Sequence, residues 1–428
     1  MDVSLPVLTR DPASESRSVR PFHIMTKPTG AICNLDCSYC FYLEKEALYP
    51  EHRAHRDFRL SDSLLENYIR QYIAQQNTSE IHFAWQGGEP TLMGLDFFRR
   101  VVELQDTHAA GKHIHNALQT NGILLTDEWC AFLRKHGFLV GLSIDGPAEL
   151  HDGYRKDESG KGTHARVMAA WQRLKDHDVD VNTMTVVHRQ NAVKPMEVYS
   201  FLKEIGSRVM QFIPLVERVR HAESESGGKA EAFCGPPDPL KPRPDPAAMV
   251  TPWSVLPGDY GTFLIAIFDH WVRRDVGSVF VTPFDWQLAI ELGMPSPTCI
   301  FSETCGRALA MEHNGDVYAC DHYVYPEHLR GNIARETLAE MVDGPAQRAF
   351  GAAKRDTLPA YCRRCEVRQH CWGECPKHRF MTTPDGEPGL QYLCPSYKQF
   401  FTHIKPRLRL MASLIRMRRA PAEIMRMV

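Results

Sequence analysis

The 428-residue sequence contains no long apolar run and no excess of charge of either sign. Because no 18 uncharged apolar residues follow one another, we expect no membrane-spanning helix, and residues 1–21 lack the apolar centre of a secretory signal. Lys and Arg number 50 against 52 Asp and Glu, so the formal charge of -2 creates no overall field for nucleic acid or an anionic membrane. We therefore expect a cytoplasmic protein whose partners are neither nucleic acid nor membrane.

Cysteine is the residue type whose distribution is informative. Thirteen cysteines, an odd number, in a chain without a secretion signal argue against a framework of disulfides. A triad lies near the N-terminus and eight more lie between residues 299 and 394, at spacings that suit metal ligation. Of the remaining two, Cys130 lies in a helical run with Trp129 and Phe132 and is expected in the core. Cys234 has no evident role.

From residue 22 to residue 214, short β-rich runs alternate with longer segments of helical period. Between the first two runs, Ser63-Leu64-Leu65-Glu66 has the pattern of a capping box that begins a helix. Six βα units predict an α/β fold in which parallel strands form a partial (β/α)6 barrel, and the carboxyl ends of the strands meet at one mouth. The expected strands are 22–26, 81–85, 115–120, 138–143, 179–187 and 209–213.

Composition divides the rest of the chain. The polar run 223–228 and the Pro-rich stretch 235–246 predict a long exposed connection, and a helical segment follows at 260–273. The basic tail beyond Lys405 is expected to form a solvated helix or a helix that docks on a partner. The expected divisions are a flexible arm at 1–21, the barrel at 22–216, a connecting region at 217–298, a cysteine-rich domain at 299–400 and a C-terminal helix at 401–428.

The N-terminal triad is Cys33, Cys37 and Cys40, spaced CxxxCxxC directly after the first expected strand. Three thiolates on one loop can bind three irons of a four-iron cluster and leave the fourth iron open to an external ligand. A zinc knuckle would need a fourth ligand, and this loop contains no His. The run Gly87-Gly88-Glu89-Pro90 follows the next strand. In isolation such a run is more often a turn, but its place one βα unit after the triad favours a functional site.

CxxxCxxC with an aromatic residue, Tyr39, before its last cysteine resembles the signature of the radical SAM superfamily, whose members use S-adenosylmethionine (SAM) and a 4Fe-4S cluster. The resemblance implies that the GGEP run holds the amino group of SAM and that Ser143 and Arg155 contact its carboxylate. Arginine suits this task because its planar fork grips a carboxylate at two points. Asp145 is equally compatible with a role in a turn. The cofactor-binding residues implied are Tyr39, Gln86, Gly87, Gly88, Glu89, Ser143 and Arg155.

The C-terminal cysteines resemble the SPASM extension of radical SAM enzymes, in which a compact CxxCx5CxxxC core precedes a distant cysteine. The resemblance implies two auxiliary 4Fe-4S clusters, and hence three clusters in all. Two zinc ribbons are the alternative, because CxxC pairs commonly build four-cysteine zinc sites. The implied ligands are Cys299, Cys305, Cys320 and Cys375 for the first auxiliary cluster, and Cys362, Cys365, Cys371 and Cys394 for the second.

Over residues 22–400 the sequence resembles the anaerobic sulfatase-maturating enzymes, through stretches that include 37–42, 86–92, 118–122, 140–147 and 317–323. The resemblance implies oxidation of a sulfatase Cys or Ser, within a Cys/Ser-x-Pro-x-Arg motif, to formylglycine by way of a 5′-deoxyadenosyl radical. It also implies an electron donor such as flavodoxin or ferredoxin. The Pro-rich stretch has no counterpart in this pattern.

Within this resemblance, Asp321 is the implied catalytic base because it directly follows the cluster ligand Cys320. We expect burial to raise its pKa; the alternative is that it caps a turn. Tyr42 is implied to contact the substrate. Two further readings stay open: SPASM-type radical modification of a ribosomally made peptide, although no winged peptide-recognition module is recognisable, and a zinc-binding scaffold protein without catalysis.

Overall fold

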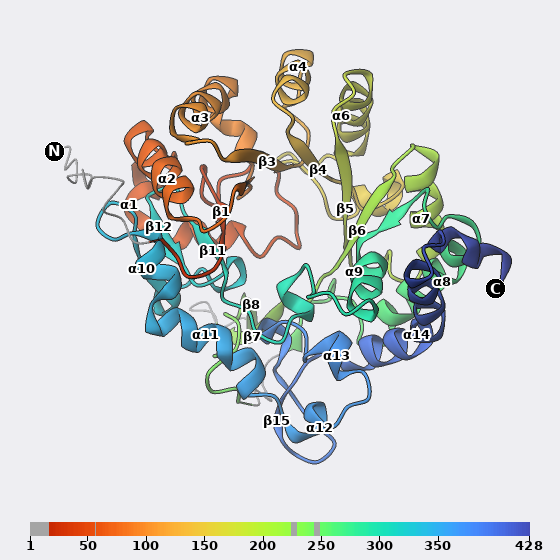
Figure 1. Ribbon diagram of the computed structural model, residues 1–428. Coiled ribbons are helices and arrows are strands. Elements are labelled where there is room, and N and C mark those ends of the chain that lie inside the picture. Colours follow the sequence, from red (N-terminus) through yellow and green to blue (C-terminus); the bar gives the residue numbers. More distant parts are fainter. Residues whose placement is uncertain (1–16, 56, 224–228, 244–248) are drawn as a thin grey trace. The chain divides into compact units, whose positions relative to one another are not determined.

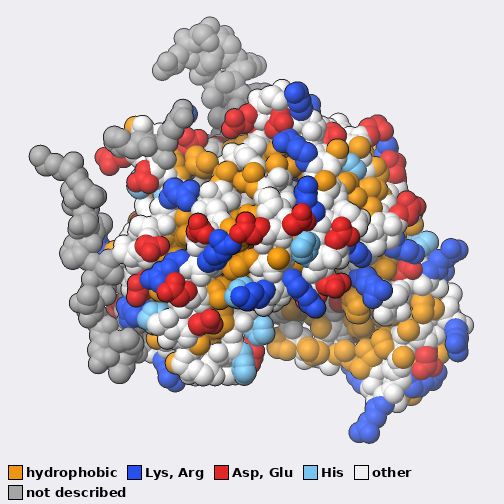
Figure 2. Space-filling model, turned by 90° about the horizontal axis from the view of Figure 1, so that it is seen from above, with side chains coloured by type: hydrophobic (Ala, Val, Ile, Leu, Met, Phe, Trp, Pro, Cys, Tyr) orange, Lys and Arg blue, Asp and Glu red, His pale blue; other side chains and the backbone are white. Residues whose placement is uncertain are grey.

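A computed structural model describes residues 17–55, 57–223, 229–243 and 249–428. Its contacts divide the chain into two compact units that do not follow chain order. Unit 1 comprises residues 1–142, 155–181 and 306–351, and unit 2 comprises 143–154, 182–305 and 352–428. No helix in the described ranges is long and apolar enough to cross a membrane. On the face shown in Figure 2, Lys and Arg side chains alternate with Asp and Glu.

Unit 1 contains the first strands of the expected barrel: β1 (His23–Thr26), β2 (Glu80–Trp85), β3 (His113–Thr120) and β4 (Leu139–Ser143). These strands pair in parallel in chain order, which confirms the predicted strands. Helices α2 (Asp62–Gln75), α3 (Leu95–His108), α4 (Asp127–Lys135) and α6 (His164–Asp176) run along the outer side of this sheet (Figure 1). Cys130, on α4, is fully buried as expected.

Helix α2 begins one residue before the predicted capping box. Its N-cap is Ser61, whose hydroxyl accepts a hydrogen bond from the backbone N–H of Leu64, so the prediction that Ser63 caps this helix is wrong. The earlier start places Asp62 in the first turn, where a negative charge is favoured by the helix dipole. The buried face of the helix, including Tyr68 and Tyr72, packs as the helical period predicts.

A second set of strands extends the sheet of unit 1 beyond β1. β11 (Ala308–Met311) pairs in parallel with β1 over all four residues, and β12 (Asp316–Tyr318) and β13 (Leu329–Asn332) continue in antiparallel pairing. The strand order within this unit is β4-β3-β2-β1-β11-β12-β13. After β12, Ala319 leads to Cys320 and then to the short 3-10 helix η5 (Asp321–Tyr323). The fold thus places the Cys-Asp pair in the same unit as the N-terminal triad.

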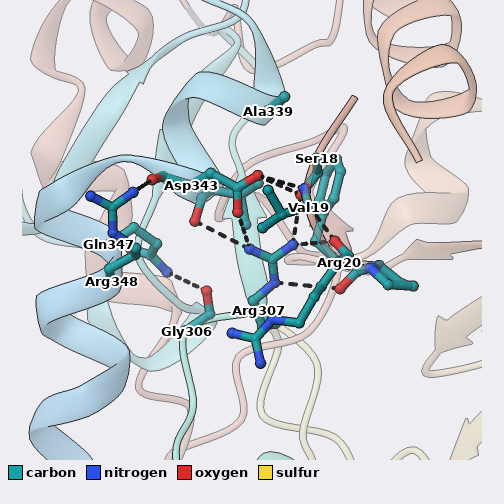
Figure 3. Close-up of polar contacts among 12 residues, drawn as sticks. Ser18, Val19, Arg20, Gly306, Arg307, Ala339, Asp343, Gln347 and Arg348 are labelled. Atoms are coloured by element: carbon teal, nitrogen blue, oxygen red, sulfur yellow. Dashed lines mark hydrogen bonds and ion pairs between the residues drawn. The ribbon is translucent and has the colours of Figure 1, made fainter. Parts of the chain in front are cut away.

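The chain before β1 is fastened to the segment around β11. Figure 3 shows Ser18 and Val19 donating hydrogen bonds to the carboxylate of Asp343, over 2.7 and 3.1 Å, while Arg307 donates to the hydroxyl of Ser18. Ser18 is 1% exposed. The end of the arm expected at residues 1–21 is therefore anchored; residues 1–16 lie outside the described part of the chain.

Unit 2 contains β5 (Val181–Val187), β6 (Val209–Pro214) and β10 (Phe280–Val281), all in parallel pairing. The predicted strands 179–187 and 209–213 are confirmed, as is the helix at 260–273, which is α8 (Asp259–Arg274). Helix α14 (Cys394–Arg416) contacts α8 and α9 (Thr282–Glu291). One face of α14 is buried, including Phe400 and Leu408, so this part of the tail is packed rather than solvated.

The long exposed connection expected after residue 216 contains a small antiparallel sheet instead. β7 (Arg218–Glu223) pairs with both β8 (Lys229–Phe233) and β9 (Met249–Val250). Val219 on β7 is 3% exposed. The prediction missed this sheet because the polar and Pro-rich residues beside the strands dominate the composition of the region.

Candidate active site

The GGEP run lies directly against the cysteine loop in unit 1. The N–H groups of Gly88 and Glu89 donate to the carbonyls of Gly30 and Ile32 over 2.8 and 2.9 Å. A Cβ atom on Gly88 would lie 1.9 Å from the carbonyl oxygen of Ile32, so only glycine permits this approach. Gly87 adopts a φ of +140°, which glycine alone tolerates readily. The two loops predicted to be functional are therefore joined through their backbones.

In the cysteine triad Cys37 is buried, and Cys33 and Cys40 are partly buried. Burial raises the pKa of the Cys33 thiol, and the nearby negative charges of Glu89, Cys37 and Cys40 raise it further. The N–H of Leu35 lies 3.4 Å from the Cys33 sulfur. Thiols held this close are costly to ionise alone, and cationic iron would compensate their charge. The residues present therefore fit a cluster with three cysteine ligands.

Glu89 is a fixed, buried carboxylate beside this loop. Its Oε1 accepts from the N–H and hydroxyl of Thr91, over 3.1 and 2.6 Å, and from the Thr120 hydroxyl over 2.7 Å. Its Oε2 accepts from the backbone N–H of Asn121 over 2.8 Å. Burial raises the pKa of Glu89, whereas these hydrogen bonds act in the opposite direction. Both oxygens of the Glu89 carboxylate therefore have fixed partners, and Thr120 and Asn121 were not predicted among them.

Two other cofactor candidates in unit 1 contact each other. The guanidinium of Arg155 lies 5.5 Å from the centroid of the Tyr39 ring, within the range of a cation–π contact. The backbone N–H of Asp36 donates to the carbonyl of Lys156 over 2.9 Å, which fastens the cysteine loop to this segment. Gln86, half-buried, donates its backbone N–H to Thr26 over 2.9 Å.

Ser143 is the last residue of β4 and the first that belongs to unit 2, and it is buried. Two residues later, the carboxylate of Asp145 accepts a hydrogen bond from the backbone N–H of Val186 over 2.9 Å. Asp145 is fully buried. This bond favours the turn role over a ligand role for Asp145.

Asp321 forms an ion pair that the sequence analysis did not predict. Its Oδ1 lies 2.6 Å from Nζ of Lys27, the residue that directly follows β1. The Lys27 side chain is 3% exposed and the Asp321 side chain 22% exposed. An adjacent ammonium favours the ionised form of a carboxylate. The expected rise of the Asp321 pKa stays a prediction. The available signal was the position of Lys27 at the carboxyl end of a barrel strand.

Tyr42 belongs to the same group of side chains. Its ring centroid lies 3.9 Å from Nζ of Lys27, and its hydroxyl donates a hydrogen bond to Glu312. Burial raises the pKa of Tyr42 well above its ordinary value, and the charges of Glu312 and Asp321 add to the effect. Glu312 is 1% exposed and was not predicted. The phenol is thus committed to a partner within the protein.

The four cysteines assigned to the second auxiliary cluster, Cys362, Cys365, Cys371 and Cys394, line one cavity in unit 2. Burial, together with the neighbouring thiols of Cys394 and Cys362, raises the pKa of Cys371 to about 12. Thiols from three separate stretches of chain therefore face one another across a space. This arrangement fits a metal cluster, although the four residues span more than 30 positions in sequence.

Three cysteines of the other auxiliary set also lie in unit 2. Burial raises the pKa of Cys375 well above its ordinary value, and Cys299 and Cys305 are among the charges that contribute. Buried Lys354, which the sequence analysis missed, donates from Nζ to the carbonyls of Cys299 and Ile300 over 2.6 and 2.9 Å. The fourth assigned ligand, Cys320, lies in unit 1.

No three or more His, Cys, Asp or Glu residues in the described ranges are spaced to hold one metal ion. A four-iron cluster does not require that spacing, because each thiolate binds a different iron.

Comparisons with known proteins agree with this geometry. Residues 28–202 match the Radical SAM superfamily, and residues 299–366 match the SPASM iron-sulfur cluster-binding domain. The chain is similar to the serine-type anaerobic sulfatase-maturating enzyme of Bacteroides thetaiotaomicron, with 44% identity over 95% of each chain. It is also similar to the cysteine-type enzyme of Clostridium perfringens, with 33% identity over 91% of this chain and 97% of the relative.

A solved structure described as native anSMEcpe with bound AdoMet and Cp18Cys peptide superposes with a TM-score of 0.76 and 33% identity, covering 92% of this chain and 99% of that chain. The fold is therefore the partial (β/α)6 barrel of radical SAM enzymes followed by a SPASM domain. These matches imply SAM, an iron–sulfur cluster and additional clusters in the SPASM region. The chain belongs to the anaerobic sulfatase-maturating enzymes, radical SAM oxidoreductases that convert a sulfatase side chain to formylglycine.

Proposed function

We propose that this enzyme oxidises a sulfatase serine and that Asp321 is the base that receives the hydroxyl proton. The observation that carries the proposal is the carboxylate of Asp321, held by Lys27 in the same compact unit as the triad and Glu89. The choice of serine is supported by the higher identity to the serine-type relative, 44% against 33% for the cysteine-type relative. The target sequence proposed is Cys/Ser-x-Pro-x-Arg.

We assign the SAM-binding roles from the same geometry. The Glu89 carboxylate receives the amino group, because its four hydrogen bonds fix both oxygens without neutralising them. Arg155 receives the carboxylate, with its guanidinium steadied over the ring of Tyr39. Ser143, Gln86 and the backbone of Gly87 and Gly88 complete the proposed contacts.

Oxidation of a serine to an aldehyde removes two hydrogens, and the protein has to handle them separately. SAM, when bound, supplies the radical that takes one hydrogen atom from the side-chain carbon. The hydroxyl proton passes to Asp321, and one electron leaves to a one-electron acceptor, for which we propose an iron–sulfur cluster of the SPASM region. Tyr42 is proposed to border the substrate, although its hydroxyl bonds to Glu312.

We propose three 4Fe-4S clusters, one at Cys33, Cys37 and Cys40 and two at the eight C-terminal cysteines. Two observations support the fit. Neighbouring thiols raise one another's pKa, and one cavity is lined by Cys362, Cys365, Cys371 and Cys394. A flavodoxin or ferredoxin in the cytoplasm is the proposed source of the electron that starts each turnover.

The test is mass spectrometry of paired peptides, one with Ser and one with Cys at the target position, after anaerobic incubation with reconstituted protein, SAM and dithionite. Loss of two hydrogen atoms from the Ser peptide is expected, at a higher rate than conversion of the Cys peptide. Asp321→Asn should lower conversion by at least about a hundredfold while 5′-deoxyadenosine still forms, because only the second step needs a base.

Full conversion by Asp321→Asn would contradict the assignment of the base. Preference for the Cys peptide would contradict the assignment of the substrate, and modification elsewhere in a precursor peptide would favour the broader SPASM class.

A further inference from the structure

The ammonium of Lys27 is an unusual group to find inside unit 1. Its side chain is 3% exposed, and a charged group removed from water is stable only when it is paired. The partner within ion-pair distance is Asp321, whose Oδ1 lies at 2.6 Å. Lys27 and Asp321 lie 294 positions apart in sequence, and they are brought together because β11 pairs with β1. The pair is therefore a product of the fold rather than of local sequence.

Lys27 is itself held on several sides. Its backbone N–H donates to the carbonyl of Met311 over 2.8 Å, and its carbonyl accepts from the N–H of Gly30 over 3.0 Å. A Cβ atom on Gly87 would lie 3.2 Å from Cβ of Lys27, so the GGEP run packs closely against the base of this side chain. The aliphatic stem consequently has little freedom to carry the ammonium elsewhere.

The far end of the Lys27 side chain lies over the ring of Tyr42, with 3.9 Å between Nζ and the ring centroid. A cation over an aromatic face is attracted by the ring, most strongly when it is desolvated. Tyr42 is fixed in turn because its hydroxyl donates to Glu312, which is 1% exposed. Glu312, Tyr42, Lys27 and Asp321 thus form a continuous chain of contacts that ends at the proposed base.

We propose that Lys27 is a positioning residue for Asp321: the ion pair fixes the direction of the carboxylate so that it faces the substrate side chain when the radical forms. Asp321 begins a short 3-10 turn and its backbone alone does not determine where its carboxylate points. A misplacement of about 1 Å can lower a rate by roughly a hundredfold. The inference rests on the proposed role of Asp321, and it assigns Lys27 no contact with SAM or with a cluster.

The central experiment compares Lys27→Met, which keeps the stem and removes the charge, with Lys27→Arg, which keeps the charge. Each variant is reconstituted, and formylglycine formed per 5′-deoxyadenosine is measured across a range of Ser-peptide concentrations. We expect Lys27→Met to lower this ratio and kcat roughly ten- to hundredfold with little change in KM. Lys27→Arg should recover part of the loss. Lys112→Met is the matched control, because Nζ of Lys112 contacts the backbone carbonyl of Gln76 at 2.9 Å, away from this site.

Adding Asp321→Asn separates a positioning role from a general structural one. If Lys27 acts through Asp321, Lys27→Met should cause no further loss of product in the Asp321→Asn background. An unchanged ratio in Lys27→Met would overturn the inference, as would independent, multiplicative losses in the double variant. Loss of 5′-deoxyadenosine formation in Lys27→Met would also overturn it, because Lys27 would then support the cysteine loop.

A thermal-unfolding cycle tests the ion pair without any turnover. It compares wild type, Lys27→Met, Asp321→Asn and the double variant. The shifts in Tm for Lys27→Met and Asp321→Asn should be less than additive when combined, since the first substitution already removes the partner of the second. Additive shifts would contradict the pair itself. If the pair couples in unfolding but wild type converts neither peptide, the proposed function fails while the contact stands.

Discussion

The hydroxyl of Thr120, at the end of β3, donates a hydrogen bond over 2.7 Å to the carboxylate of Glu89, just beyond the end of β2. The backbone N–H of Asn121 occupies the other oxygen over 2.8 Å. Two neighbouring strands thus set the direction of one buried acid. The Glu89 side chain is therefore already ordered before a ligand binds, so that binding costs little further conformational entropy.

Glu89→Gln should weaken SAM binding by about tenfold or more, because a hydrogen bond to a charged group contributes about 1.5–3 kcal/mol. Equilibrium binding of SAM to anaerobically reconstituted protein measures the change. Glu66→Gln, on the exposed face of α2, is the control and should bind as wild type does. Equal affinity for wild type and Glu89→Gln would remove Glu89 from the binding site.

Gly88→Ala should destroy the contact between the two loops, because its Cβ would lie 1.9 Å from the carbonyl oxygen of Ile32. The backbone has to move, so we expect loss of the triad cluster, seen as a loss of about one third of the iron, together with a lower Tm. Gly258→Ala is the matched control, since a Cβ there meets no atom within 4 Å. If Gly88→Ala keeps its full iron content and the wild-type Tm, the cysteine loop and the GGEP run can move apart enough to accept the added Cβ.

Iron and acid-labile sulfide should each amount to about twelve per chain, since eleven thiolates match one three-ligand and two four-ligand clusters. Replacing Cys33, Cys37 and Cys40 by Ala should leave about eight irons and abolish SAM cleavage, whereas Cys365→Ala should reduce iron and yield of folded protein. Zinc without sulfide would instead support the scaffold reading. Cys130→Ala, at a buried thiol in α4, should leave the iron content unchanged.

His23, at the start of β1, should make the free energy of unfolding depend on pH. Burial lowers the pKa of His23 to about 4, and the neighbouring charge of His82 contributes. Between the ordinary His pKa and about 4 the unfolded chain binds the proton that the native state refuses, so the free energy of unfolding decreases as the pH falls through this window. The loss can reach about 3 kcal/mol.

Urea unfolding of wild type and His23→Gln at about pH 7 and about pH 5 measures this effect. The variant should lose less stability on acidification than wild type does, whereas His113→Gln, at an exposed position of β3, should follow wild type. If His23→Gln loses as much unfolding free energy on acidification as wild type does, other groups cause the acid sensitivity.

The barrel strands and the cysteine groups could be predicted because their signals are local. A strand such as β2 alternates buried and exposed residues within six positions, and CxxxCxxC occupies eight positions of one loop. The same locality explains the error at α2: Ser61 and Ser63 are both suitable caps, and only the packed structure selects Ser61.

The missing parts of the candidate site depend on contacts between distant segments. Lys27 is an ordinary lysine in the sequence, and its role follows from the pairing of β1 with β11, a strand of only four residues. Glu312 and Lys354 are likewise recognisable only through burial beside their partners. Charged residues of this kind are usually exposed, so apart from the place of Lys27 just after a barrel strand the sequence gives no reason to place them inside.

The pairing of β1 with β11 also affects how the protein can be made. On the ribosome, β1 is synthesised about 280 residues before its partner, so one edge of the nascent barrel stays open for most of translation. Open strand edges of this kind invite pairing with other chains. A fragment that stops before residue 306 would leave the edge of β1 open, so we expect it to aggregate rather than to fold as an autonomous N-terminal domain.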